Sequence, residues 1–224
     1  MYYPSTTPHF LQTLFPQIVF SYPSSNLEKT LYLTFDDGPT PEITEWVLSL
    51  LAAYEAQATF FCIGKNVQQH PLLFEKIKTH RHAIGNHTHH HLNGWLTSNA
   101  VYLADIQLAS KYIPSYLFRP PYGRLGIQQV HQIRKQLVSP TIYKASSSNV
   151  VLQGYKIIMW SILSGDFDKN LDAARCFRTI VKEAKSGSII VFHDSIKAAP
   201  LLRVILPKVL QYYSNLGYRF KACY

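Results

Sequence analysis

Cysteines and acidic side chains are both scarce in this sequence. The 224 residues include three cysteines, Cys62, Cys176 and Cys223, which lie far apart and form no C-x-x-C pair. That spacing argues against a thiolate zinc site or a redox pair. We expect free buried thiols, with a single disulfide as the alternative.

Acidic residues are outnumbered by basic ones. The sequence has 13 Asp and Glu and 22 Lys and Arg, for a net charge of +9. The basic residues are scattered, and they form neither a long run nor a basic helix face. This pattern predicts a basic solvated surface and no nucleic-acid partner. A surface that attracts a polyanion is the alternative.

Long apolar runs are absent, and none approaches the roughly 20 residues that a membrane-spanning helix needs. The first Lys or Arg is Lys29, and Pro16 interrupts the only early apolar stretch, so no signal peptide is predicted. By default this places the protein in the cytoplasm, with the cell envelope as the alternative. The sequence does not indicate an oligomeric state.

What the sequence does contain is a regular alternation of β-rich and helical segments. Strands are predicted at 31–35, 58–63, 83–85, 116–118, 155–160, 188–192 and 218–222, with a minor one at 141–143. Helices are predicted at 41–54, 71–78, 99–113, 126–137, 171–185 and 201–214. The alternation predicts an α/β fold with a parallel sheet. Residues 1–30 are expected to be an irregular N-terminal segment, and 31–224 a single domain.

Polar residues follow several of these strands directly. Asp36 and Asp37 follow the first strand, and the later ones are followed by His87, Arg119, Asp166 and His193. In a parallel barrel the carboxyl ends of all strands meet on one face, whereas an open sheet spreads them along an edge. We therefore predict a distorted, TIM-barrel-like (β/α) barrel of about seven parallel strands.

Histidine is concentrated in one place, because six of the ten histidines lie between His80 and His91. His87 and His91 are four residues apart, so on a helical turn they would share one face. With Asp37 they would form a His₂Asp metal site that leaves a position open, which is typical of catalytic zinc. Co²⁺, Ni²⁺ or Mn²⁺ also suit these ligands. The alternative is a polar loop, and His89 and His90 are expected to point outward or to be accessory.

The adjacent carboxylates Asp36 and Asp37 end the first strand with their side chains on different sides. One is therefore able to bind a metal while the other acts as general base toward a water. The alternative is that Asp-Asp-Gly-Pro serves only the geometry of a turn.

Five segments in order resemble the motifs of the polysaccharide deacetylases (carbohydrate esterase family 4, the NodB-homology domain). They are Thr34-Phe35-Asp36-Asp37-Gly38-Pro39, His87-Thr88-His89-His90-His91, Arg119-Pro120-Pro121-Tyr122-Gly123, Asp166-Phe167 and Val191-Phe192-His193. Phe167 stands where the family usually has Trp, and Val191 where it usually has Leu. The resemblance covers residues 31–223 and makes 31–224 a catalytic NodB-homology domain.

The resemblance implies metal-dependent removal of an N-acetyl, sometimes O-acetyl, group from a polysaccharide or oligosaccharide such as an N-acetylglucosamine polymer. It implies that Asp37, His87 and His91 hold the metal, with Zn²⁺ expected. It also implies Asp36 as the catalytic base, Arg119 as its partner, and Tyr122 as the oxyanion donor through its backbone N–H. His193 would be the general acid, oriented by Asp166.

Two alternatives to this function remain open from the sequence. One is a carbohydrate-binding relic without turnover, and the other is a hydrolase of a small non-sugar amide on the same scaffold. Trp95 and Trp160 are expected to pack in the core, since large aromatics are usually buried. Stacking of either ring on a sugar is the alternative.

Overall fold

The computed structural model describes residues 5–23, 28–135 and 154–224. The minor strand predicted at 141–143 lies outside these residues. Within them, no helix has both the length and the apolar character needed to cross a bilayer.

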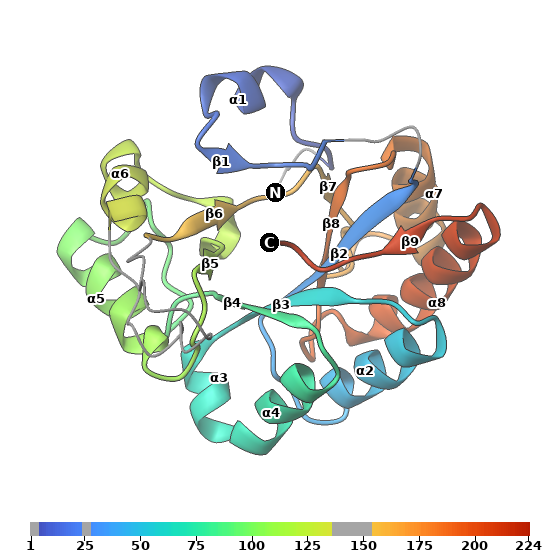
Figure 1. The fold of residues 1–224 in the computed structure, drawn as a ribbon, viewed down its shortest axis with the longest axis horizontal. Helices are drawn as coiled ribbons and strands as arrows, with labels where there is room; N and C mark the ends of the chain where they lie inside the picture. Colours follow the sequence, from blue (N-terminus) through green and yellow to red (C-terminus); the bar gives the residue numbers. More distant parts are fainter. Residues whose placement is uncertain (1–4, 24–27, 136–153) are drawn as a thin grey trace, which may run out of the picture.

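The strands form one curled sheet with helices outside it (Figure 1). Among the described residues the strand order is β1-β6-β5-β4-β3-β2-β8-β7, with β9 also paired to β2, and all pairings between named strands are parallel. The strands are β1 (Ile18–Val19), β2 (Thr30–Asp36), β3 (Ala58–Cys62), β4 (Ala83–Asn86), β5 (Leu117–Phe118), β6 (Lys156–Ile158), β7 (Ile162–Leu163), β8 (Ile189–His193) and β9 (Arg219–Phe220). The predicted barrel-like α/β fold is confirmed.

Helices cover the outer face of this sheet (Figure 1). They are α1 (His9–Leu14), α2 (Ile43–Ala53), α3 (Gly64–Gln69), α4 (Pro71–Thr79), α5 (Asn99–Ser110), α6 (Ile127–Lys135), α7 (Ala173–Glu183) and α8 (Ala199–Asn215), with a 3₁₀ turn η1 (Pro121–Gly123). The sequence did not predict α3, which lies just before α4. Helix α7 begins where the Asp172 carboxylate accepts a hydrogen bond from the backbone N–H of Arg175, a typical N-cap.

Side chains of alternate residues in β2 point to opposite faces of the sheet, and both faces are buried. Phe35 points outward and stacks with Phe60 and Phe192, at centroid distances of 5.0 and 5.8 Å, under the helices. Tyr32 points inward, where it joins a second cluster that fills the barrel. This inner cluster contains Tyr22, Tyr32, Phe61, Leu117, Ile158, Ile189 and Cys223. The barrel interior is thus a packed core on which polar residues at the strand ends can be held rigidly.

The N-terminal segment, expected to be irregular, contains α1 and β1 instead. Strand β1 pairs with β6, and Thr6 forms an antiparallel bridge with Ile162 of β7. The segment thus borders both ends of the sheet and closes the ring between β6 and β7 (Figure 1). A strand of two residues is too short to show the alternation of apolar and polar residues from which strands are predicted. The prediction was wrong here for that reason.

The strand predicted at 155–160 is shorter, and a separate strand β7 follows it. Between the two strands, backbone groups bond to other parts of the chain. The Met159 N–H donates to Val19 O, and the Met159 carbonyl accepts from Arg119 Nη2. The Trp160 carbonyl accepts from the Thr7 hydroxyl. Asp166 therefore follows β7 rather than a strand that ends at Trp160.

Candidate active site

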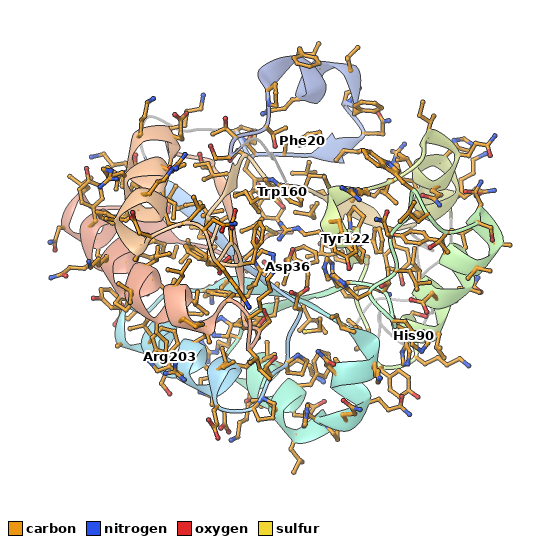
Figure 2. The ribbon with its side chains drawn as sticks, turned by 180° about the vertical axis from the view of Figure 1, so that it is seen from behind. Phe20, Asp36, His90, Tyr122, Trp160 and Arg203 are labelled. Atoms are coloured by element: carbon orange, nitrogen blue, oxygen red, sulfur yellow. The ribbon has the colours of Figure 1, made fainter. Side chains whose placement is uncertain are left out.

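The polar residues predicted at strand ends do gather on one face of the barrel. Asp36 ends β2 and is directly paired in register with His193, which ends β8. His87 follows β4 and Arg119 follows β5. In the view of Figure 2, Asp36 and Tyr122 both lie toward the middle of the ring, whereas His90 and Arg203 lie toward the periphery. The site is therefore built by the carboxyl ends of neighbouring parallel strands.

Asp37, His87 and His91 each bring one ligand atom within 4.8 Å of the others. His91 Nε2 lies 3.1 Å and His87 Nε2 3.7 Å from Asp37 Oδ1. The Nδ1 atom of His87 lies 2.7 Å from the carbonyl oxygen of Arg119, so this nitrogen carries the proton and Nε2 keeps its lone pair toward Asp37. One carboxylate and two imidazoles in this arrangement fit a divalent metal of the zinc type.

The protonation states of these groups also suit a metal. Burial lowers the pKa of His87 to about 4, so the ring is neutral at pH 7 and able to act as a ligand. Burial alone would raise the pKa of Asp37. The hydrogen bond from His91 and the charge of His193 outweigh it and hold that pKa below its usual range. The cluster therefore offers an anion and a neutral imidazole.

The segment from His87 to His91 is a loop and not the predicted helical turn. Thr88 and His91 have φ angles of 63° and 57°, in the left-handed region, which no right-handed helix allows. The three side chains of the cluster nevertheless meet, because hydrogen bonds from neighbouring helices hold the loop in place. Its backbone receives hydrogen bonds from α3, where the Gly64 N–H donates to Thr88 O and the Lys65 N–H to His89 O.

Asp105, in the middle of α5, holds the same loop from the other side. Its Oδ2 accepts the backbone N–H groups of His89 and His90 at 2.8 and 2.9 Å, and its Oδ1 contacts His90 Nδ1. His89 and His90 are not part of the ligand cluster. Both were expected to point outward or to be accessory; His89 is buried rather than outward, and it is accessory to the cluster. Asp105 was not predicted, because nothing in the local sequence marks a helical Asp as a partner of this loop.

Arg119 is completely buried and forms a salt bridge with Asp36, the carboxylate next to Asp37. Its Nη1 donates to Asp36 Oδ1 and to Thr34 Oγ1, both at 2.7 Å. Its Nε and Nη2 donate to the carbonyls of Ile158 and Met159, and its guanidinium lies 4.1 Å from the Phe61 ring centroid. Each guanidinium nitrogen thus donates at least one hydrogen bond, which fixes the guanidinium in place. The Asp36 carboxylate bonded to it is therefore held in one orientation.

His193 and Asp166 form a second buried pair of titratable side chains in the site. Asp166 Oδ1 lies 2.8 Å from His193 Nδ1, and its Oδ2 accepts the His193 backbone N–H at 2.8 Å. Burial lowers the pKa of an imidazole, but the Asp166 charge and hydrogen bond outweigh it and raise the pKa of His193 to about 9. His193 is therefore protonated at neutral pH.

Comparison with known proteins identifies the family. A family model for polysaccharide deacetylase matches residues 24–138. The peptidoglycan-N-acetylglucosamine deacetylase of Bacillus cereus is 34% identical over 201 residues, which are 87% of this chain and 86% of that protein. The chain belongs to the polysaccharide deacetylase family.

Further relatives agree with this assignment. The chitooligosaccharide deacetylase of Azorhizobium caulinodans is 29% identical over 178 residues, 75% of this chain and 74% of that protein. A crystal structure of the Bc1960 peptidoglycan N-acetylglucosamine deacetylase superposes with a TM-score of 0.74 at 25% identity, covering 96% of this chain and 94% of that one. The protein is thus a polysaccharide deacetylase, a hydrolase of a family that depends on a metal.

Tyr122 in this deacetylase contacts His91 at the ring nitrogen that does not face Asp37. Its hydroxyl is 3.1 Å from His91 Nδ1, and its φ of 60° turns the backbone at the start of the Tyr-Gly pair. Among the described residues, no hydrogen-bond partner is found for the Tyr122 backbone N–H. The side chain thus helps to orient His91, while the backbone N–H stays available as a donor.

Trp95 contradicts the expectation of core packing, because 65% of its surface is exposed. Its indole N–H donates to the carbonyl of Leu125, and the Arg124 guanidinium lies 5.2 Å from its ring centroid. Trp160 is half-buried beside Arg119, 5.7 Å from the guanidinium. The stacking alternative therefore stays open for Trp95.

Asp194 is a buried residue of the site that was not among the predicted site residues. Its buried carboxylate accepts hydrogen bonds from the Gly38 N–H and the Thr44 hydroxyl, directly beside Asp37. A Cβ on Gly38 would come within 2.0 Å of this carboxylate, so only glycine fits. Asp194 thereby holds the loop that carries Asp37.

Replacing Asp105 by Ala is expected to weaken metal binding by about 10-fold to 100-fold, as for other partners that orient a ligand. The reason is that the N–H groups of His89 and His90 lose their acceptor, so the loop that carries His91 is no longer held. Metal affinity by competition with a chelator measures this. Unchanged affinity in a folded variant would show that α3 alone holds the loop.

Proposed function

We propose that this deacetylase removes the N-acetyl group from N-acetylglucosamine residues of a glycan, with a zinc ion held by Asp37, His87 and His91. The observation that carries the proposal is the position of this ligand cluster beside Asp36 and the protonated His193. The named activities of the Bacillus and Azorhizobium relatives support the same sugar.

The donor set favours zinc, with Co²⁺, Ni²⁺ or Mn²⁺ as alternatives that bind the same nitrogen and oxygen ligands. When bound, the metal supplies a Lewis acid that polarises the acetyl carbonyl and makes water a better nucleophile. Three protein ligands leave coordination space for substrate.

Asp36 is the general base in this proposal. Water adds to the carbonyl carbon of the acetamide and loses a proton, which the Asp36 carboxylate accepts. The salt bridge to Arg119 at 2.7 Å keeps that carboxylate in place. The negative charge that develops on the carbonyl oxygen is stabilised by a hydrogen bond from the Tyr122 backbone N–H.

His193 is the general acid that completes the reaction. The C–N bond breaks as His193 gives its proton to the departing amine, and the products are acetate and the free amino sugar. Asp166 fixes the ring through Nδ1, so the proton that is transferred lies on Nε2. Base and acid are thus separate residues on paired strands, Asp36 and His193.

Acetate release from a panel of substrates tests this function. N-acetylglucosamine oligomers should yield acetate and free amines, whereas acetylated xylan and small cyclic amides should be poor substrates. A strong chelator and Asp36→Asn should each abolish the release. Binding of the oligomer without any acetate, despite bound metal, would favour a relic, and preference for the cyclic amide would favour the non-sugar hydrolase.

A further inference from the structure

A cavity of about 480 Å³ lies beside the metal cluster, with Asp37 and His91 in its wall. The rest of its lining comes from the loop between β2 and α2, from α3, and from the loop between β8 and α8. Ligand pockets in proteins range from about 300 to 1,000 Å³, so one sugar ring with a substituent fits here. Any group bound in this cavity is next to the reacting acetamide.

The lysine in this cavity is Lys197, from the loop between β8 and α8. Among the described residues, no carboxylate lies within ion-pair distance of its ammonium group. The Nζ atom is 5.5 Å from the centroid of Phe167, whose ring in turn meets His193 edge-on at 5.0 Å. An aromatic face therefore places this positive charge close to the catalytic acid.

The acidic groups nearby are already engaged. Asp37 is the carboxylate in the cavity lining and belongs to the metal cluster, and Asp194 is bonded to Gly38 and Thr44. Asp166 is bonded to His193. Lys197 itself is exposed, and so is the apolar side chain of Ile196, the residue before it in the cavity lining.

We propose that Lys197 binds a carboxylate on the sugar next to the one that is deacetylated, so that the enzyme prefers a carboxylate-bearing glycan to a neutral one. A single ammonium matches the single charge of a carboxylate, whereas phosphate sites usually combine several donors. The net charge of +9 draws such an anionic polymer toward the protein. The inference rests on the proposed function, because it names the neighbour of the reacting N-acetylglucosamine.

Two oligosaccharides of equal length test this inference, one made of N-acetylglucosamine alone and one in which every second sugar carries a carboxylate. Their binding to the metal-loaded protein is measured by calorimetry, and their deacetylation by acetate release. In Lys197→Met the affinity and kcat/KM for the carboxylated oligomer should fall about 10-fold to 100-fold, typical of a hydrogen bond to a charged group. Values for the neutral oligomer should change less than about twofold, since an exposed lysine contributes little elsewhere.

Lys208→Met is the matched control, because Lys208 is an exposed lysine of α8 that does not line the cavity. It should leave both oligomers unaffected. Equal losses on the two oligomers in Lys197→Met, or no loss on the carboxylated one, would overturn the inference. Wild-type protein that binds the carboxylated oligomer through Lys197 but releases no acetate from either would instead refute the proposed function.

Discussion

Replacing His87 with alanine is expected to lower kcat/KM for acetate release by about three orders of magnitude or more. A bound metal contributes several kcal/mol to stabilisation of the transition state, and each 1.36 kcal/mol corresponds to a factor of ten in rate. His87 is suited to this role because it is buried and neutral, with Nδ1 bonded to Arg119 O and Nε2 facing Asp37. Elemental analysis of the purified variant should find the metal lost along with the activity.

His80→Ala is the control for this prediction. His80 belongs to the same histidine-rich stretch, but its ring is exposed and contacts only the carbonyl of Lys76 among the hydrogen bonds found for it. This variant should keep its metal and its rate. A His87→Ala enzyme that retains both would exclude His87 as a ligand.

His193→Asn removes the proposed general acid and should lose about 10²-fold to 10⁴-fold in kcat, the usual contribution of such a group. The pH dependence gives a sharper test. Because the Asp166 carboxylate raises the pKa of His193 to about 9 against the effect of burial, the acid form persists through neutral pH. On the alkaline side, the wild-type rate should therefore hold through neutral pH and fall as pH rises through about 9.

Asp166→Asn removes the charge that raises this pKa, so the alkaline fall in rate should move toward the ordinary imidazole value of about 6.5. The matched control is Asp172→Asn, since Asn still caps α7 and Asp172 is remote from His193 in the hydrogen-bond network. Its pH profile should match that of the wild type. An unshifted profile in Asp166→Asn would mean that His193 is not the group that titrates.

The parts of the site that could be predicted are those carried by strand ends. Asp36, His87, Arg119 and His193 lie at or directly after short apolar runs, and the parallel topology then brings them together without further information. The barrel was predictable for the same reason. Local sequence was sufficient here because the strand and its polar end are adjacent in the chain.

The contacts that hold this site in shape could not be predicted. Asp105 reaches the loop of His91 from a helix, and only the fold brings it there. The spacing of His87 and His91 fits a helical turn and a loop equally well, and the positive φ of Thr88 has no signal in its residue type. Asp194 directly follows His193 in the sequence, so its place near the site could be predicted. Its hydrogen bond with Gly38 could not, because the two residues are far apart in the chain.

The central claim is that acetate release depends on a metal held by Asp37, His87 and His91. The most direct measurement follows metal content and acetate release from an N-acetylglucosamine oligomer in one sample, as a chelator removes the metal and zinc is then added back. We predict that the rate falls in proportion to the metal lost and returns with zinc, and that Asp37→Ala cannot be restored. A full rate at negligible metal content would contradict the claim.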